Sequence, residues 1–179
     1  KTNMGKGTTI DRKICINIFK QIKNSIQTKY KNKIYLFHGN MSKEEISSLY
    51  THPQIKCLIS GTRGEGYGLP LIEAASAGLP VVATNWSGHL DFLGDKFTKI
   101  DYELVEIPEA RVDNRIFFKG HKWANPSLTD MSKKIKDMYI NLEEYKKQAS
   151  ILKNEIIKNF SKQKNHEIYN NIFKKYLIG

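Results

Sequence analysis

The chain contains few of the residues that build disulfide frameworks, zinc sites and membrane spans. Its 179 residues include only two cysteines, Cys15 and Cys57, and the interval between them matches no metal-ligand motif. This disfavours a disulfide framework or a zinc site and favours a reducing compartment. The sequence also has no signal peptide and no run of about 18 apolar residues that could span a membrane. We therefore expect a cytoplasmic protein, with peripheral association at a membrane surface as an alternative.

Acidic residues are also scarce relative to basic ones. The chain has 18 Asp and Glu residues and 29 Lys and Arg residues, which gives a formal net charge of +11. Such a charge suits a polyanion, a phosphate-bearing ligand or an acidic membrane surface. The lysines are spread along the chain, as on solvated helix faces, and no clustered basic or aromatic motif of a nucleic-acid module is recognisable. The sequence therefore disfavours a nucleic-acid partner.

Apolar periodicity predicts alternating helices and strands in the first two thirds of the chain. Ile14, Ile18 and Ile22 form the stripe of an amphipathic helix after Asp11, and Ser42 to Glu45 form a capping box that opens a second helix. Pro70 suits the first turn of a third helix, which Gly78 can end. The segments that predict strands are KIYLF at 33–37, KCLIS at 56–60 and PVVAT at 80–84.

This order predicts an α/β fold with an open, Rossmann-like, doubly wound parallel sheet, because parallel strands are joined by crossover helices. Residues 127–177 carry apolar positions at helical spacing, which predicts extra C-terminal helices, with residues 143–179 as a helical tail. No linker or repeat divides the chain, so we expect one domain over residues 1–179. Ligands of such sheets bind at the carboxyl ends of the strands.

A glycine loop, TRGEGYG at 62–68, lies at one of these strand ends. Gly66 and Gly68 leave backbone N–H groups accessible near a helix N-terminus, which favours an anion such as a phosphate. A carboxylate repels a phosphate, so Glu65 makes sense if it faces a hydroxyl-rich part of the same ligand. Glu73, in the following helix, can accept two hydrogen bonds from a ribose diol. The alternative is a plain strand-to-helix turn with solvated carboxylates.

The segment GEGYGLPLIEAASAGLPVVAT resembles the donor-binding motif of the retaining glycosyltransferases of GT-B fold, with Glu65 and Glu73 as its E-x7-E pair. Three further segments resemble family elements in the expected order, although they match less closely. They are Asp11-Arg12-Lys13, FHGNMSKEEISSLY and SGHLDFL, and KWANPSLTDMSKKIKDMY extends the similarity to about residue 140.

The resemblance implies the C-terminal, donor-binding half of a GT-B enzyme that transfers a sugar from a nucleoside diphosphate sugar with retention of configuration. By this analogy Glu65 contacts the sugar and Glu73 the ribose, and Arg12 and Lys13, or Lys6, neutralise the leaving diphosphate. The catalytic set is thus Glu65, Arg12 and Lys13. The substrate-binding set is Gly66, Tyr67, Gly68, Leu69, Glu73, Thr84 and Gly88.

The resemblance also bears on metals and partners. The family binds its donor without a metal, and this chain has no Asp-x-Asp pair to hold one. We expect no cofactor besides the donor substrate. We expect the chain to be a fragment that lacks an N-terminal acceptor domain and is inactive in isolation. Its last apolar stripe, Ile168, Ile172, Phe173 and Tyr176, then predicts weak self-association.

One alternative function stays open, namely a non-catalytic nucleotide-binding α/β domain. The two hypotheses differ in what the sugar contributes. A donor domain binds the sugar nucleotide more tightly than the free nucleotide, whereas a nucleotide-binding domain gains no affinity from the sugar.

Overall fold

The structure is a computed structural model that describes residues 7–26 and 33–177. Its internal contacts divide the chain into two compact units, Lys1–Ile46 and Ser47–Gly179.

The first unit contains helix α1 (Thr9–Ser25) and the start of helix α2 (Lys43–Thr51). A capping box opens α1, in which the Thr8 hydroxyl accepts the Asp11 N–H and the Asp11 carboxylate accepts the Thr8 N–H. The capping box predicted for α2 is confirmed, since Ser42 and Glu45 exchange the same pair of bonds. Cys15 is the buried residue of α1.

The strand predicted at 33–37 is wrong. Those residues form no strand in the structure, and Ile34, Tyr35 and Phe37 are all at least 49% exposed. The apolar, β-rich composition of this segment suits a strand, but a strand needs a hydrogen-bonded neighbour, and the described sheet does not include these residues.

The second unit is built on a three-stranded parallel sheet, formed by β1 (Leu58–Ser60), β2 (Val81–Thr84) and β3 (Thr98–Ile100) in that order. Helix α3 (Leu69–Ser76) connects β1 to β2, and the short helix α4 (Leu90–Leu93) follows β2. The predicted strands at 56–60 and 80–84 are confirmed at 58–60 and 81–84. Pro70 lies in the first turn of α3, and Gly78, at a φ of 83°, follows its end.

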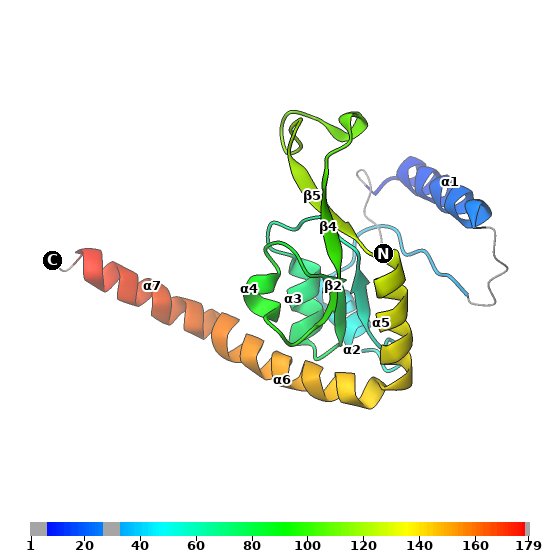
Figure 1. Cartoon of the computed structure of the whole chain (residues 1–179). Coiled ribbons are helices and arrows are strands. Elements are labelled where there is room, and N and C mark those ends of the chain that lie inside the picture. The colour runs from blue at the N-terminus through cyan, green and yellow to red at the C-terminus, as the bar shows by residue number, and fades with distance from the viewer. Residues whose placement is uncertain (1–6, 27–32, 178–179) are drawn as a thin grey trace. The chain divides into compact units, whose positions relative to one another are not determined.

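Both faces of the sheet are covered, which explains why all four residues of β2 are buried. Val81 and Ala83 belong to a core cluster with α3 and α6 (Leu142–Phe160), whereas Val82 packs with Met138 of α5 (Leu128–Ile140). The two helix layers are visible in Figure 1 on either side of the sheet. The chain therefore has the Rossmann-like α/β fold that its pattern predicts.

A two-stranded antiparallel hairpin follows the sheet and was not predicted from the sequence. It pairs β4 (Tyr102–Glu106) with β5 (Lys122–Pro126) and carries the short 3-10 helix η1 (Glu109–Arg111) in its connection (Figure 1). The connection is ordered by Asp113, whose carboxylate accepts three successive backbone N–H groups from residues 115–117. These hydrogen bonds hold the pKa of Asp113 below its usual value.

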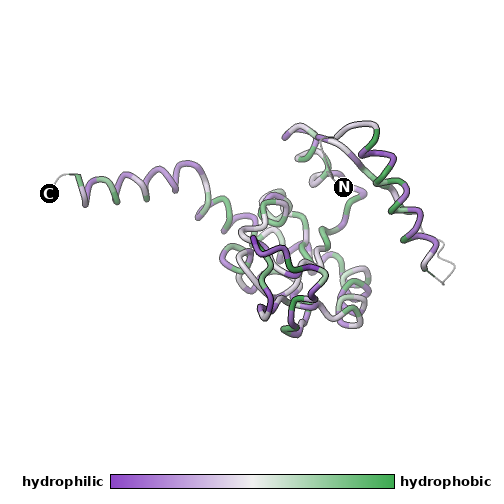
Figure 2. Tube along the Cα trace, turned by 90° about the horizontal axis from the view of Figure 1, so that it is seen from above, coloured by the Kyte–Doolittle hydropathy of each residue, from purple (hydrophilic) through white to green (hydrophobic). Residues whose placement is uncertain are grey.

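The helices predicted over 127–177 are α5, α6 and α7 (Lys162–Leu177). Helix α6 contributes Leu152 and Ile156 to the core, whereas α7 buries none of its residues. Figure 2 shows hydrophobic segments recurring along α7 between hydrophilic ones. Within the described residues, every helix is too short or too polar to cross a membrane.

Candidate functional site

The glycine loop connects the carboxyl end of β1 to the N-terminus of α3. The last residues of β1 and β2 are neighbours in the sheet, since Ser60 pairs in register with Ala83. The loop and the turn after β2 therefore meet at one edge of the sheet, where ligands of this fold class bind. This juxtaposition brings together Glu65, Gly66, Gly68 and Gly88 of the predicted site.

The turn after β2 holds the backbone of Glu65 directly. The Ser87 hydroxyl accepts the Glu65 N–H at 2.9 Å and donates to the Glu65 carbonyl at 2.6 Å. The N–H of Gly88 also donates to that carbonyl, at 3.2 Å. Three hydrogen bonds thus link two segments that are 22 residues apart.

The approach of these two segments explains the glycine at position 88. A Cβ on Gly88 would lie 2.2 Å from the Gly66 carbonyl oxygen and 3.0 Å from that of Glu65. No side chain fits at such a distance from a backbone atom. Gly88 therefore has a packing role in the structure, and its predicted contact with the substrate stays a prediction.

Gly66 and Gly68 differ in whether the fold requires a glycine at their positions. Gly68 caps α3 with a φ of 90°, and a Cβ there would lie 3.1 Å from the Cβ of His89, so the fold itself requires glycine. Apart from its two chain neighbours, a Cβ on Gly66 would meet no atom of the described residues within 4 Å, and its φ is not left-handed. Neither packing nor backbone conformation explains Gly66.

The two carboxylates of the predicted motif lie on different elements. Glu65 is in the loop and partly buried, whereas Glu73 is exposed on α3. Burial, and secondarily the negative charge of Glu73, raise the pKa of Tyr50, which packs against the core. Glu73 is thus accessible to a polar ligand.

The neighbouring residues Tyr67 and Leu69 are both exposed. The ring of Tyr67 packs against Phe92 with a centroid distance of 5.2 Å, as expected for a side chain under the loop, and remains 43% exposed. Leu69, at the start of α3, is 62% exposed. Both side chains can therefore contact a ligand that lies over the loop.

Thr84 and His89 lie completely buried at the end of β2 and the start of α4. The His89 Nε2 lies 2.7 Å from the Thr84 carbonyl, and because a carbonyl can only accept, Nε2 donates. Within the described residues, the Thr84 hydroxyl and the His89 Nδ1 have no hydrogen-bond partner. The contact of Thr84 with the substrate stays a prediction.

Arg63 is directed toward an aromatic ring. Sequence alone leaves open whether Arg63 pairs with Glu65 or reaches a ligand. In the structure its guanidinium lies 4.6 Å from the centre of the Trp123 ring in β5, and its carbonyl accepts the Ala124 N–H at 3.2 Å. The hairpin thus supports the first part of the glycine loop.

Arg12 and Lys13 lie exposed in the first turns of α1, in the other compact unit. Their contact with a diphosphate stays a prediction. Lys6, the alternative, lies outside the described residues.

Sequence reasoning missed Ser87, although one local signal points to it. Ser87 has a φ of 95°, which is unusual for a residue with a side chain. A Ser-Gly pair shortly after a buried strand, here separated from β2 by Asn85 and Trp86, marks a turn. The 22-residue interval from Glu65 gave no sign of the contact between them.

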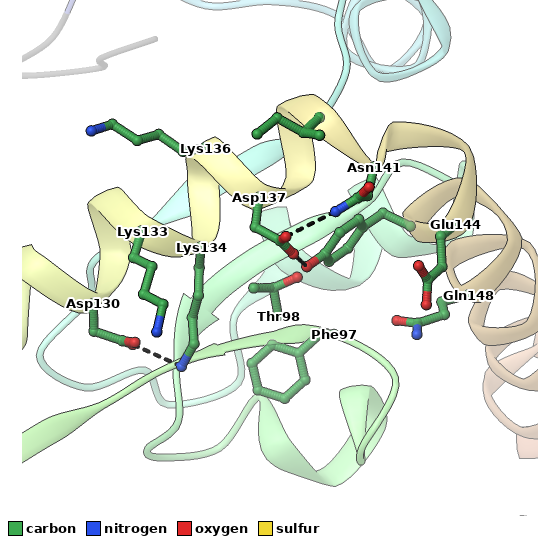
Figure 3. Close-up of a pocket in the computed structure, with 12 residues that line it drawn as sticks. Phe97, Thr98, Asp130, Lys133, Lys134, Lys136, Asp137, Asn141, Glu144 and Gln148 are labelled. Atoms are coloured by element: carbon green, nitrogen blue, oxygen red, sulfur yellow. Dashed lines mark hydrogen bonds and ion pairs between the residues drawn. The ribbon is translucent and has the colours of Figure 1, made fainter.

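A hollow of about 750 Å³ lies elsewhere, between α5, α6 and the amino end of β3. Figure 3 shows that several of its polar side chains bind one another, with Lys134 paired to Asp130 at 2.7 Å and Asn141 donating to Asp137 at 2.9 Å. The hydrogen bond from Lys134 holds the pKa of Asp130 below its usual value. The Tyr145 hydroxyl also donates to Asp137, which, together with burial, raises the pKa of Tyr145 to about 12. These groups are satisfied within the protein.

Comparison with known proteins identifies the class to which this α/β domain and its glycine loop belong. The model of the family described as glycosyl transferases group 1 matches residues 17–110, which is more than half of the chain and includes the whole glycine loop. The chain belongs to this family. The matched range begins after Arg12 and Lys13.

Two individual relatives match a shorter segment. Both are described as the serotype-specific mannosyltransferase WbdA of Escherichia coli, and each is 45% identical to this chain over 51 residues. The matched segment covers 28% of this chain and 6% of each relative. The chain is thus similar to a small part of those proteins.

Proposed function

We propose that this chain binds a nucleoside diphosphate sugar at the glycine loop and supplies the donor site for sugar transfer with retention of configuration. The observation that carries the proposal is the open space beside the backbone of Gly66. The preceding residue, Glu65, is held in place by three hydrogen bonds. A ligand that approaches this backbone explains a glycine that packing does not. Family membership supports the reaction class.

Each part of the donor has a proposed partner. Glu65 accepts hydrogen bonds from sugar hydroxyls, and the backbone of Gly66, Tyr67 and Gly68 contacts the sugar and its phosphate. The exposed carboxylate of Glu73 accepts two hydrogen bonds from the ribose. Leu69, Thr84 and Gly88 complete the proposed site.

Arg12 and Lys13 would stabilise the leaving diphosphate in place of a metal, so no cofactor is needed. In the proposed reaction the diphosphate departs before the acceptor attacks on the same face, and a phosphate oxygen takes the acceptor proton. Stabilisation of the leaving group is then the main contribution of the protein.

We further propose that the 179 residues bind the donor without transferring its sugar. All of the proposed contacts are with the donor, whereas the acceptor is expected to bind a separate domain in this family. If no group positions the acceptor, the rate gain from positioning it is lost. Mannose is the first sugar to test, because the two relatives are described as mannosyltransferases.

The experiment is a calorimetric titration of the whole chain with the mannose esters of guanosine and uridine diphosphate and with both free diphosphates. We expect Glu65→Gln to weaken the sugar nucleotide by about 10-fold to 100-fold, because a hydrogen bond to a charged group contributes about 1.5–3 kcal/mol, and to spare the free diphosphate. Glu73→Gln should weaken both ligands, because they share the ribose. Glu109→Gln, an exposed carboxylate on the hairpin connection, is the matched control.

The same titration tests the other parts of the proposal. Replacing Arg12 and Lys13 with Gln should reduce diphosphate affinity, and the loss should shrink at high salt because the attraction is screened. A chelator should change nothing. If the sugar adds no affinity in the wild-type chain, the protein is a non-catalytic nucleotide-binding domain. If the isolated chain transfers sugar, its proposed inactivity is wrong.

A further inference from the structure

Ser87 forms the most direct link between the turn after β2 and the glycine loop. Its one hydroxyl accepts the N–H of Glu65 and donates to the carbonyl of the same residue. Both peptide groups that flank the Glu65 Cα are therefore fixed by one side chain. The direction in which a side chain leaves the backbone depends on these two peptide groups, so Ser87 controls where the Glu65 carboxylate can reach.

The backbone of Ser87 shows that this arrangement has a conformational cost. Its φ of 95° lies in the region that favours glycine, yet position 87 carries a side chain. Glycine would satisfy the turn more easily, and strained residues of this kind cluster at functional sites. The hydroxyl supplies what glycine could not, namely the two hydrogen bonds to Glu65.

The surrounding contacts are arranged so that the link is short and rigid. Gly88 has no side chain and lets the turn approach the loop, while its own N–H adds a third bond to the Glu65 carbonyl. The Ser87 carbonyl accepts the N–H of Leu90 at 3.1 Å, which joins the turn to the start of α4. The hydroxyl is thus held between an anchored turn and the loop.

We propose that Ser87 is a positioning residue of the donor site, which holds the Glu65 carboxylate in place for the sugar of the donor and so determines how strongly the protein prefers a sugar nucleotide to the free nucleotide. This inference rests on the proposed function, because it assigns Ser87 to the same site. Ser87 contacts no ligand in this scheme and acts only through Glu65.

Two substitutions at this position separate positioning from folding. Ser87→Gly relieves the strained φ but also removes the two hydrogen bonds to Glu65, and these two changes have opposite effects on the melting temperature. Ser87→Thr keeps the hydroxyl but places a β-branched residue at a positive φ, so the melting temperature should fall. A positioning role predicts that only the variant without the hydroxyl loses its preference for the sugar, whichever of the two variants is the more stable.

The readout is the ratio of two dissociation constants, for guanosine diphosphate and for its mannose ester, or for the uridine pair if that is the pair the wild-type chain binds. We expect Ser87→Gly to lower this preference about tenfold, through weaker binding of the sugar nucleotide, and Ser87→Thr to keep it. Ser25→Gly, which removes a hydroxyl bonded to a backbone carbonyl at the end of α1, is the matched control and should keep the wild-type ratio.

The outcomes separate this inference from the proposed function. If Glu65→Gln loses the preference for the sugar but Ser87→Gly keeps it, the positioning role is wrong and the donor site stands. Equal weakening of both ligands by Ser87→Gly would show a purely structural role and overturn the inference. If Glu65→Gln keeps the preference, or the wild-type chain binds neither pair, the proposed function fails and the inference fails with it.

Discussion

Helices α3 and α7 are both expected from the sequence, but they differ in whether their apolar residues are buried. In α3, Leu71, Ala74 and Ala75 are at most 2% exposed and pack in the core with β2 and α6. In α7, Ile168 and Ile172 are 44% and 46% exposed, and none of the residues of the helix is buried. The sequence predicts a helix in both cases, from Pro70 and Gly78 for α3 and from apolar periodicity for α7. It does not predict whether another element covers the apolar face.

The largest expected effect tests this contrast. Leu71→Ala should lower the free energy of unfolding by about 2–5 kcal/mol, because it leaves a cavity in a packed core. Ile172→Ala should lower it by less than about 1 kcal/mol, because the side chain is already half in water. Urea unfolding of the two variants measures the difference. Similar losses in both would mean that α7 packs on another surface in solution.

A smaller effect on stability is expected from alanine substitutions at Gly66 and Gly88, which lie on either side of the same backbone contact. Gly88→Ala should lower the free energy of unfolding by about 1–3 kcal/mol, because its Cβ overlaps the Gly66 carbonyl. Gly66→Ala should change it by less than about 0.5 kcal/mol, since its Cβ enters open space.

Ligand titration tests whether Gly66 also has a role in binding. Gly66→Ala should weaken sugar-nucleotide binding although it leaves stability unchanged, because the added methyl group occupies space proposed for the donor. If affinity is unchanged as well, Gly66 has no role in binding, and the main support for the donor site is lost.

The smallest expected effect concerns the exposed stripe of α7, formed by Ile168, Ile172, Phe173 and Tyr176. We propose weak self-association through this stripe, because exposed apolar surface favours contact with a second copy. Tyr176→Asn should weaken association about tenfold, whereas Tyr139→Asn, at a still more exposed tyrosine on α5, should not. Sedimentation across a concentration series measures both. A chain that is monomeric at every concentration contradicts the proposal.

Local pattern predicted much of the fold because the relevant interactions are close in sequence. The capping box of Ser42 and Glu45 spans three residues, and Pro70 and Gly78 mark the two ends of α3 through their own backbone preferences. The uninterrupted apolar run of β2 predicts a strand buried on both faces, and the two core clusters confirm it.

Pairing between strands could not be predicted with the same success. Residues 33–37 have the composition of a strand but are not part of the described sheet, whereas β4 and β5 contain polar residues and still pair. Strand formation depends on a partner elsewhere in the chain, and composition records only the preference of the segment itself.

The features of the candidate site also fall into those that depend on local sequence and those that depend on contacts between distant segments. By itself the sequence determined the glycine loop, the helix that follows it and the Glu65 and Glu73 pair, because these depend on residue type and short spacing. Only the tertiary structure decided that Ser87 binds the backbone of Glu65, that Gly88 is required by the Gly66 carbonyl, and that Arg63 stacks on Trp123. Each of these contacts joins segments more than 20 residues apart, and such distances are set by the packing of the sheet and its helices.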